Sequence, residues 1–271
     1  MANKRLRRIA MGLKTLFGPR AQGFFTPYRY ADTVKIPERY PELEACFDAA
    51  VPEITDVLEG IAEAYPDLQA LDGPPPRPRW GQSWFPRLDG AAAYAIVRRA
   101  EPSRIVEVGS GHSTRMLAHA APAGCQLTCI DPEPRAALSG LDIDWQRAVL
   151  SAEHLPLFSA LAAGDIAFFD SSHILWEGTD VDLMLARILP ILAPGVLVHI
   201  HDVTLPDPYP RDWAWRGYTE QLGLAGYLTS PAWQIVWSSH YAVTRLDAAA
   251  RVPALPLPSG ARETSLWLRR A

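Results

Sequence analysis

Residues 104–114 read RIVEVGSGHST, an apolar, β-branched stretch that runs into a glycine-rich turn. Comparable apolar stretches recur at 126–131 (QLTCID), 166–170 (IAFFD) and 196–202 (VLVHIHD), and segments with helical patterning separate them. Near-continuous apolar strands that alternate with helices predict a parallel sheet covered on both faces. Three weaker stretches predict further strands: 145–150, 234–237 and 265–268. The sequence therefore predicts an α/β fold with a doubly wound, mostly parallel sheet of seven strands.

Helical patterning also precedes the predicted sheet. Segment 41–65 reads as two helices, with Pro52 in the first turn of the second. Residues 72–79 (DGPPPRPR) hold four prolines in eight residues, which is typical of a stiff, extended linker. We therefore expect a helical accessory region with its linker over residues 1–79 and the sheet-bearing domain over residues 80–271.

The first 20 residues differ from the rest of the chain in charge. They hold six of the 26 basic residues and none of the 30 acidic ones, so the remaining chain has ten more acids than bases. Apolar residues at three- and four-residue steps predict an amphipathic helix here: Leu6, Ile9, Ala10, Leu13 and Phe17. Two interpretations stay open, namely peripheral attachment of residues 1–20 to an anionic membrane surface and a terminal helix that docks on the protein or frays.

Composition excludes several classes of protein. The acidic body argues against a nucleic-acid partner, which would require a basic face. The longest apolar stretch, 188–200, is too short for a membrane-spanning helix and contains Pro190 and Pro194. The three cysteines show no metal or redox spacing and are interpreted as buried thiols in a reducing cytoplasm. We expect a cytoplasmic protein, membrane-peripheral if the amphipathic helix binds lipid.

Ligands of open parallel sheets bind where the carboxyl ends of the strands meet. The first strand ends in residues 109–111 (GSG), where glycines let the backbone approach a ligand. The second ends at Asp131, where an acid can bind both hydroxyls of a ribose. A dinucleotide fingerprint needs a third glycine where this chain has Thr114, and Glu107 adds a charge that disfavours phosphate. The loop therefore favours a cationic nucleoside without phosphate.

These features together resemble a known family. The motif EVGSGxST at 107–114, the acid that ends the second strand, and the polar exits at 168–173 and 198–202 resemble the class I S-adenosylmethionine-dependent methyltransferases, in particular a branch that modifies small molecules. The resemblance covers about residue 88 to the C-terminus and implies a Rossmann-like sheet. It implies that Asp131 holds the ribose of the cofactor and that Ser151 lies near the adenine. It further implies that Glu107, Gly109 and Gly111 cradle the methionine part, with Ser110 and Ser113 nearby, and Asp170 completes the expected cofactor-binding set.

The substrate side is expected at two later strand exits. Methyl transfer to a hydroxyl requires an in-line arrangement and removal of a proton, and an imidazole with a pKa of about 6.5 suits the second task. His173 and His201 are therefore the candidates for the base, while Asp170 and Asp202 orient the acceptor or a metal. His199, two residues before His201, is expected deeper along its strand, in the core.

A divalent metal is a further candidate cofactor. Metal-assisted catechol-type methyltransferases, which the chain resembles in fold, place acids at these two strand exits and another ligand directly after the second. Asp170 and Asp202 match this pattern, but Val203 has no ligand atom. Two carboxylates could hold magnesium only with water and substrate as the other ligands, and His173 or His201 would complete a softer site. Metal dependence and the metal ligands therefore stay unassigned.

Aromatic residues follow the last polar strand exit. Residues 211–224 are patterned as one helix and carry Trp213, Trp215, Tyr218 and Glu220. Aromatic side chains close to a ligand site can form the wall of a pocket. We expect this segment to border the acceptor.

The sequence therefore predicts methyl transfer from S-adenosylmethionine to a small-molecule acceptor, at oxygen. One alternative is an NAD-dependent oxidoreductase, which Thr114 and the lack of any lysine after Lys35 disfavour. Another is a non-catalytic cofactor-binding protein attached to a membrane or a partner, which the intact polar strand exits disfavour. The acceptor (a sugar, a phenol, a lipid headgroup or a peptide) and the oligomeric state stay open.

Overall fold

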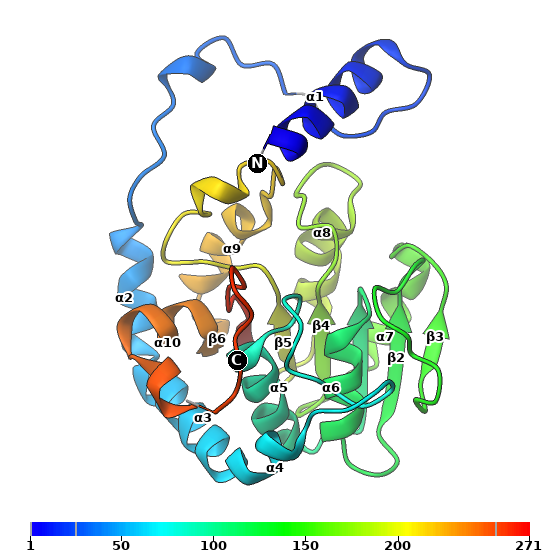
Figure 1. The fold of residues 1–271 in the computed structure, drawn as a ribbon, viewed down its shortest axis with the longest axis vertical. Helices are drawn as coiled ribbons and strands as arrows, with labels where there is room; N and C mark the ends of the chain where they lie inside the picture. Colours follow the sequence, from blue (N-terminus) through cyan, green and yellow to red (C-terminus); the bar gives the residue numbers. More distant parts are fainter. Residues whose placement is uncertain (1, 25, 253) are drawn as a thin grey trace.

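The computed structural model describes residues 2–24, 26–252 and 254–271, and its centre is a seven-stranded sheet in the order β3-β2-β1-β4-β5-β7-β6 (Figure 1). β7 runs antiparallel to both of its neighbours, and the other six strands share one direction. The predicted doubly wound, Rossmann-like, mostly parallel sheet is confirmed. The strands are β1 (Arg104–Val108), β2 (Gln126–Ile130), β3 (Asp144–Gln146), β4 (Ile166–Phe169), β5 (Leu197–Ile200), β6 (Trp233–Ser238) and β7 (Leu266–Arg270).

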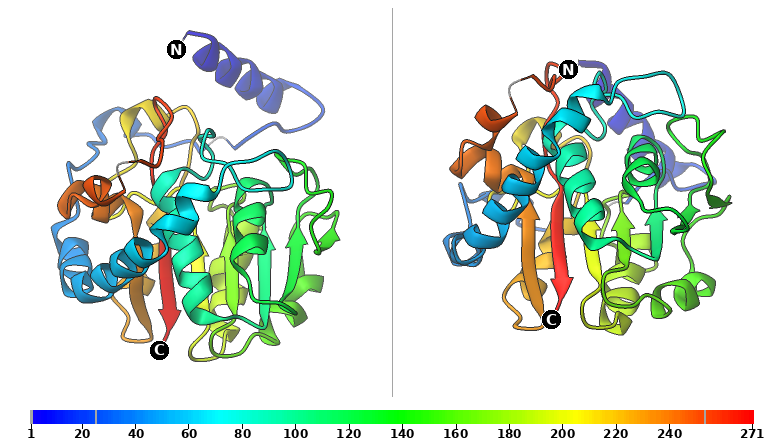
Figure 2. Two further views of the ribbon diagram at one scale, coloured as in Figure 1. Left: turned by 60° about the horizontal axis from the view of Figure 1, so that its bottom comes forward. Right: turned by 90° about the horizontal axis from the view of Figure 1, so that it is seen from below.

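Helices cover both faces of the sheet, as its apolar strands require. The left view of Figure 2 shows α3 (Val51–Glu63), α5 (Arg87–Ala100) and α6 (His112–Ala120) in front of the strands, and α5 contacts both of the others. Adjacent residues of β4 point to opposite faces: Phe168 meets Phe85 next to α5, whereas Phe169 stacks on Phe158 of α7. The second face carries α7 (Leu155–Ser159), α8 (Asp180–Leu183), a π-helical turn (Met184–Ile188) and a 3₁₀ turn (Leu189–Ile191).

The accessory helices pack on the sheet-bearing part of the chain. α2 (Pro41–Ala49) and α3 follow each other as predicted, each with a proline in its first turn, and α4 (Tyr65–Ala70) comes next. Phe47 and Ile54 are fully buried, and α3 packs against α5 and β6. α2–α4 and the sheet therefore share one continuous hydrophobic core.

The segment expected as one helix over 211–224 is divided. A 3₁₀ turn (Arg211–Trp213) and α9 (Glu220–Leu228) are separated by a bend in which Gly217 has a φ of +70°, so the prediction of a single helix is wrong. Glycine adopts this left-handed conformation without steric cost, which interrupts the helix. The bend brings Arg216 and Tyr218 to the carboxyl edge of the sheet. The remaining elements are α10 (Ser239–Arg245) and 3₁₀ turns at Ala31–Thr33, Ala152–His154 and Ala248–Arg251.

The predicted N-terminal helix is present as α1 (Ala2–Phe17). Figure 1 shows it beyond the carboxyl edge of the sheet, linked to the body by a long segment whose described residues from 18 to 39 are all exposed. Among its described side chains, Lys4 lies over the ring of Trp215, and Arg8 donates a hydrogen bond to the carbonyl of Ala214. None of the helices that the structure describes has the length and apolar character needed to cross a bilayer.

Candidate active site

A pocket of about 310 Å³ lies at the carboxyl ends of β1, β2 and β4. It contains the loop after β1, the acid that ends β2 and the first residues after β4, as the sequence predicts. A second hollow, of about 330 Å³, lies between α3 and α5 at the opposite edge of the sheet and contains none of the predicted site residues. The pocket at the carboxyl edge is lined by Val108, Gly109, Ser110, Ile130, Asp131, Pro132, Glu133, Arg135, Ala148, Val149, Leu150, Asp170, Ser171, Ser172 and Asp180.

Gly109 joins the loop after β1 to the exit of β4. Its φ is +81°, and a Cβ added there would lie 1.8 Å from the carbonyl oxygen of Asp170. Asp170 in turn donates its main-chain N–H to the carbonyl of Val108. Only glycine permits this approach, so the residue type at position 109 fixes where Asp170 enters the pocket.

Polar atoms around the loop remain available to a ligand. The Ser110 hydroxyl and His112 Nδ1 are buried and have no hydrogen-bond partner among the described residues. Burial lowers the pKa of His112 to about 4, with help from the charge of Arg115, so its ring is neutral at pH 7. The carboxylate of Asp131 accepts main-chain hydrogen bonds from Ser110 at 2.5 Å and Glu133 at 2.7 Å, which fixes its orientation.

Glu107 supports the loop from beneath. Its carboxylate is fully buried and accepts hydrogen bonds from the hydroxyls of Ser113 and Thr114, each at 2.6 Å, and from the thiol of Cys129. Burial raises the pKa of Glu107 to about 7 despite these bonds. Glu107 and Ser113 thus contact each other and tie the end of β1 to the start of α6.

Two other expected cofactor residues lie beside the pocket. The backbone of Gly111 is extended, and its amide donates to the hydroxyl of Thr114 at 2.8 Å, which starts α6. Ser151 follows Leu150, which lines the pocket, and its hydroxyl lies 3.1 Å from Nδ1 of His154. The adenine contact expected of Ser151 stays a prediction.

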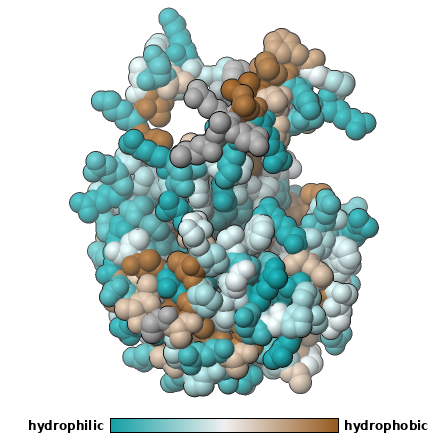
Figure 3. Space-filling model, in the orientation of Figure 1, coloured by the Kyte–Doolittle hydropathy of each residue, from teal (hydrophilic) through white to brown (hydrophobic). Residues whose placement is uncertain are grey.

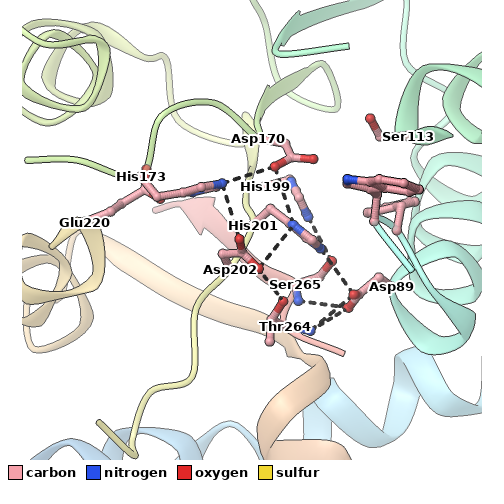
Figure 4. A network of polar contacts seen from close by, with 12 residues as sticks. Asp89, Ser113, Asp170, His173, His199, His201, Asp202, Glu220, Thr264 and Ser265 are labelled. Carbon is pink, nitrogen blue, oxygen red and sulfur yellow. Dashed lines mark hydrogen bonds and ion pairs between the residues drawn. The ribbon is translucent and has the colours of Figure 1, made fainter. Parts of the chain in front are cut away.

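The four predicted catalytic residues lie together. Figure 4 shows His173 and His201 pointing toward Asp170 and Asp202 at the exits of β4 and β5. His173 Nε2 lies 3.3 Å from Asp170 Oδ1 and 3.5 Å from Asp202 Oδ2. His201 Nδ1 lies 3.5 Å from the same Asp170 oxygen and 3.8 Å from Asp202 Oδ1. Asp170 alone of these four also lines the pocket, so it joins the pocket to the network.

Each imidazole is held from behind by a second, buried carboxylate. Glu220, the first residue of α9, lies with Oε2 2.8 Å from His173 Nδ1. Asp89 of α5 lies with Oδ2 3.2 Å from His201 Nε2, and its oxygens also accept the main-chain N–H groups of Thr264 and Ser265. Such a partner fixes the orientation of an imidazole ring, as second carboxylates do in catalytic triads.

The surrounding carboxylates favour the protonated imidazoles. Burial alone would lower the pKa of His173, but hydrogen bonds to Asp170 and Glu220 outweigh it and raise the pKa to about 10. Burial likewise opposes the charge on His201, but Asp170 and Asp89 raise its pKa well above the usual value. Burial would raise the pKa of Asp170, yet the charges of His201 and His173 hold it well below its usual range.

His199 is a core residue, as predicted. It is fully buried, and its ring stacks on Phe168 with a centroid distance of 3.7 Å. Its Nε2 lies 2.9 Å from the hydroxyl of Ser265. Burial, together with the nearby charge of His201, lowers its pKa well below the usual value, so the ring is neutral.

The donor set at this edge does not suit a divalent cation. Arg216 Nη1 lies 3.1 Å from Asp202 Oδ2, and the Thr264 hydroxyl donates to Asp202 Oδ1 at 3.3 Å. The imidazoles already face Asp170, so the carboxylates expected as metal ligands are neutralised by the chain itself. Among the described residues, no group of three or more histidine, cysteine or acidic side chains has an arrangement suited to a metal. We therefore derive no catalytic step through a metal.

Sequence reasoning missed three parts of this network. Asp89 lies on the buried face of the alanine-rich helix α5. An acid at such a position indicates that a polar group from another part of the chain binds it. Glu220 was expected only as part of a pocket wall, but it contacts His173 directly, while the Tyr218 ring lies 4.7 Å from that imidazole. Nothing in the sequence indicates that Arg216 contacts Asp202, because this contact depends on the bend at Gly217.

Part of the chain is similar to a known protein family. Residues 106–203 match the family model described as a methyltransferase domain. These residues include the loop after β1, Asp131 and the exits of β4 and β5. The match confirms the methyltransferase resemblance for this part of the chain. No curated protein matches the sequence.

Several solved structures are similar. The O-methyltransferase TomG from Streptomyces achromogenes, involved in tomaymycin synthesis and solved with SAM, has 17% identity and a TM-score of 0.45, with 79% of this chain and 89% of that chain covered. An O-methyltransferase from Bacillus cereus, solved with SAH, has 15% identity and a TM-score of 0.43, covering 85% and 97%. A methyltransferase from Geobacter sulfurreducens has 15% identity and a TM-score of 0.39, covering 88% and 98%. At such low scores these likenesses carry no functional argument.

Proposed function

With residues 106–203 a methyltransferase domain, we propose that the protein transfers a methyl group from S-adenosylmethionine to an oxygen atom of a small-molecule acceptor. The observation that carries the proposal is the position of Asp170. It belongs both to the pocket at the carboxyl edge and to the buried network of His173, His201 and Asp202. The pocket proposed for the cofactor and the imidazoles proposed as the base thus meet at Asp170.

The charge of the pocket supports a cationic ligand. Its lining contains Asp131, Glu133, Asp170 and Asp180 against one basic residue, Arg135. The positive sulfur of S-adenosylmethionine is favoured by such a lining, whereas the two phosphates of NAD would be repelled. The pocket therefore supports the adenosyl cofactor over the alternative of a nicotinamide-dependent oxidoreductase.

The polar groups of the pocket suit the parts of this cofactor. Asp131 would bind the ribose hydroxyls, and the free Ser110 hydroxyl and the close approach at Gly109 would serve the methionine part. Val149 and Leu150 provide apolar surface for the adenine. When bound there, S-adenosylmethionine supplies a methyl group on a positively charged sulfur, which an acceptor oxygen can displace.

Asp170 would orient the acceptor hydroxyl, and an imidazole would receive its proton. His173 Nε2 and His201 Nδ1 both face the same Asp170 oxygen, so either nitrogen is placed for this role. A protonated imidazole cannot accept a further proton, and the pKa of both rings is raised. The base would therefore have to lose its own proton first, which makes the reaction faster at alkaline pH.

We also propose that residues 1–20 make peripheral contact with an anionic membrane. Most apolar side chains of α1 are exposed, and so are the basic side chains Lys4, Arg7, Arg8, Lys14 and Arg20. Helices that combine an apolar stripe with cations bind at the interface of anionic bilayers. The alternative of a terminal helix that only docks on the protein has less support, since the exposed apolar side chains of α1 do not face the body and its described contacts come from Arg8 and Lys4.

Methyl transfer to oxygen is tested with S-adenosylmethionine that carries a labelled methyl group. The protein would be incubated with a panel of phenols, sugars and hydroxylated lipids, and the labelled products analysed by mass spectrometry and NMR. We expect an O-methyl product that is lost in Asp170→Asn. Label at nitrogen or carbon, or no transfer by a protein that binds the cofactor, would contradict the proposal.

A further inference from the structure

An ordinary surface helix packs its apolar side on the protein, whereas the apolar side of α1 is exposed to solvent. Met11 is half-buried, whereas five other large apolar side chains of the helix are exposed, from 50% for Ile9 to 84% for Phe17. At 100° per residue these side chains fall within about a third of the helix circumference. Lys4 and Arg8 lie on the other side and make its contacts with Trp215 and Ala214. The polar side of α1 therefore rests on the protein, and its apolar side is turned outward.

Charge indicates what covers this apolar side. The first acidic residue of the chain is Asp32, so every charged residue before it is basic, whereas the rest of the chain has more acids than bases. Figure 3 shows the apolar surface of this region rising from a hydrophilic surround at the top of the molecule. Apolar and cationic side chains together match an anionic lipid bilayer, which offers acyl chains and negative headgroups at once.

Contacts of this N-terminal region reach both sides of the catalytic edge. Phe24 stacks on Trp176 with a centroid distance of 5.1 Å, and Trp176 follows the pocket-lining residues Ser171 and Ser172. On the other side, α1 contacts Trp215, and the next residue, Arg216, contacts Asp202. The N-terminal region therefore contacts the body through Trp176 and Trp215, so a surface that receives α1 would also meet this edge.

We propose that α1 holds the catalytic edge against an anionic bilayer and that the methyl acceptor is a hydroxyl-bearing amphiphile of that bilayer. The inference rests on the proposed methyl transfer and names its substrate class. Trp176 and Trp215 are partly exposed and suit the boundary between water and lipid, where aromatic side chains with a polar atom are favoured. An acceptor would enter between these two aromatic residues, from the lipid toward Asp170.

Docking is tested by flotation of the full chain with vesicles of phosphatidylcholine that do or do not contain phosphatidylglycerol. Binding should need the anionic lipid and fall at least tenfold in the double variant Leu13→Glu/Phe17→Glu. The matched control is Ile191→Glu, because Ile191 is a similarly exposed apolar residue at the opposite edge of the sheet. Equal binding by the double variant and the control, or no binding by the wild type, would overturn the docking.

The orientation of the protein on the bilayer is tested by tryptophan quenching with brominated phosphatidylcholine in the anionic vesicles. Quenching should decrease in Trp176→Phe and Trp215→Phe. It should stay unchanged in Trp233→Phe, since Trp233 begins β6 at the far edge of the sheet. Quenching that depends on Trp233 rather than on Trp176 and Trp215 would overturn the proposed orientation.

The acceptor class is tested with a whole-cell lysate of the source organism and S-adenosylmethionine tritiated on the methyl group. After solvent extraction, label should appear in the lipid phase and fall in Leu13→Glu/Phe17→Glu but not in Ile191→Glu. Label confined to the aqueous phase and equal in both variants would overturn the amphiphilic acceptor and leave the methyl transfer intact. Absence of transferred label would overturn the proposed function, and with it the acceptor class, whereas the vesicle experiments decide the docking independently.

Discussion

The carbonyl oxygen of Asp170 occupies the space that a side chain at Gly109 would need. A Cβ at position 109 would lie 1.8 Å from this oxygen, far inside van der Waals contact. The loop expected to hold the cofactor and Asp170, which we propose orients the acceptor, are therefore positioned by the same backbone contact. Because β1 and β4 are neighbours in the sheet, the contact also fixes how their two exits diverge.

Gly109→Ala should damage stability and binding together. The new methyl group must displace the backbone of Asp170, and the alanine must also adopt a positive φ. We therefore expect the free energy of unfolding to fall by about 3 kcal/mol or more. The comparison is Gly124→Ala, which has a similar φ of +86° but no atom within 4 Å of the added Cβ. Urea titrations of both variants check this, and an equal loss in the two would show that only backbone strain is involved.

The raised pKa of His173 predicts that stability falls at alkaline pH. The folded protein keeps this proton up to pH about 10, while the unfolded chain releases it near pH 6.5. Because the folded state binds more protons in this window, the contribution is complete below pH 6.5 and is lost as the pH rises to about 10, by at most about 1.4 kcal/mol per pH unit. Urea unfolding at several pH values measures the slope. Glu220→Gln should flatten it, and an unchanged slope would contradict the ion pair.

Glu220 should act as a positioning residue that sets the pH dependence of catalysis. With His173 as the base, the rate should increase with pH toward about 10, because only the neutral ring accepts a proton. Replacing Glu220 by Gln keeps the shape but removes the charge, so the rise should move to lower pH. Asp89→Asn should do the same if His201 is the base. pH–rate profiles of the two variants therefore identify the base. Unchanged profiles in both variants would exclude both imidazoles as the base.

Chelation should leave the reaction unaffected. Arg216 and the two imidazoles neutralise the carboxylates that a metal would need. Rates measured with EDTA and with added magnesium should agree within twofold, as should the affinity for the adenosyl cofactor. A rate that requires magnesium would mean that Arg216 and the imidazoles move away from Asp170 and Asp202 when the acceptor binds.

Local patterns predicted the sheet and the residues at its edge, because each strand carries its own exit residues. The strand at 104–108 and the polar residues that follow β4 and β5 needed only the alternation of apolar strands and helices. Asp89 and Glu220 could not be found in this way. Asp89 lies 112 positions before His201 along the chain, and Glu220 lies 47 positions after His173. Their contacts therefore depend on how helices pack on the sheet. The bend at Gly217 shows the same limit, since helical spacing alone did not reveal a glycine with positive φ.

The most direct test is calorimetric titration of the wild type and Asp131→Ala with S-adenosylmethionine, S-adenosylhomocysteine and NAD. We predict binding of both adenosyl ligands and none of NAD. Loss of a charged partner of the ribose typically costs about 1.5–3 kcal/mol, so Asp131→Ala should bind roughly ten- to a hundredfold more weakly. The control variant Asp144→Ala removes an exposed acid of β3 and should bind as the wild type does. Binding of NAD alone, or of neither adenosyl ligand, would contradict the proposed methyltransferase.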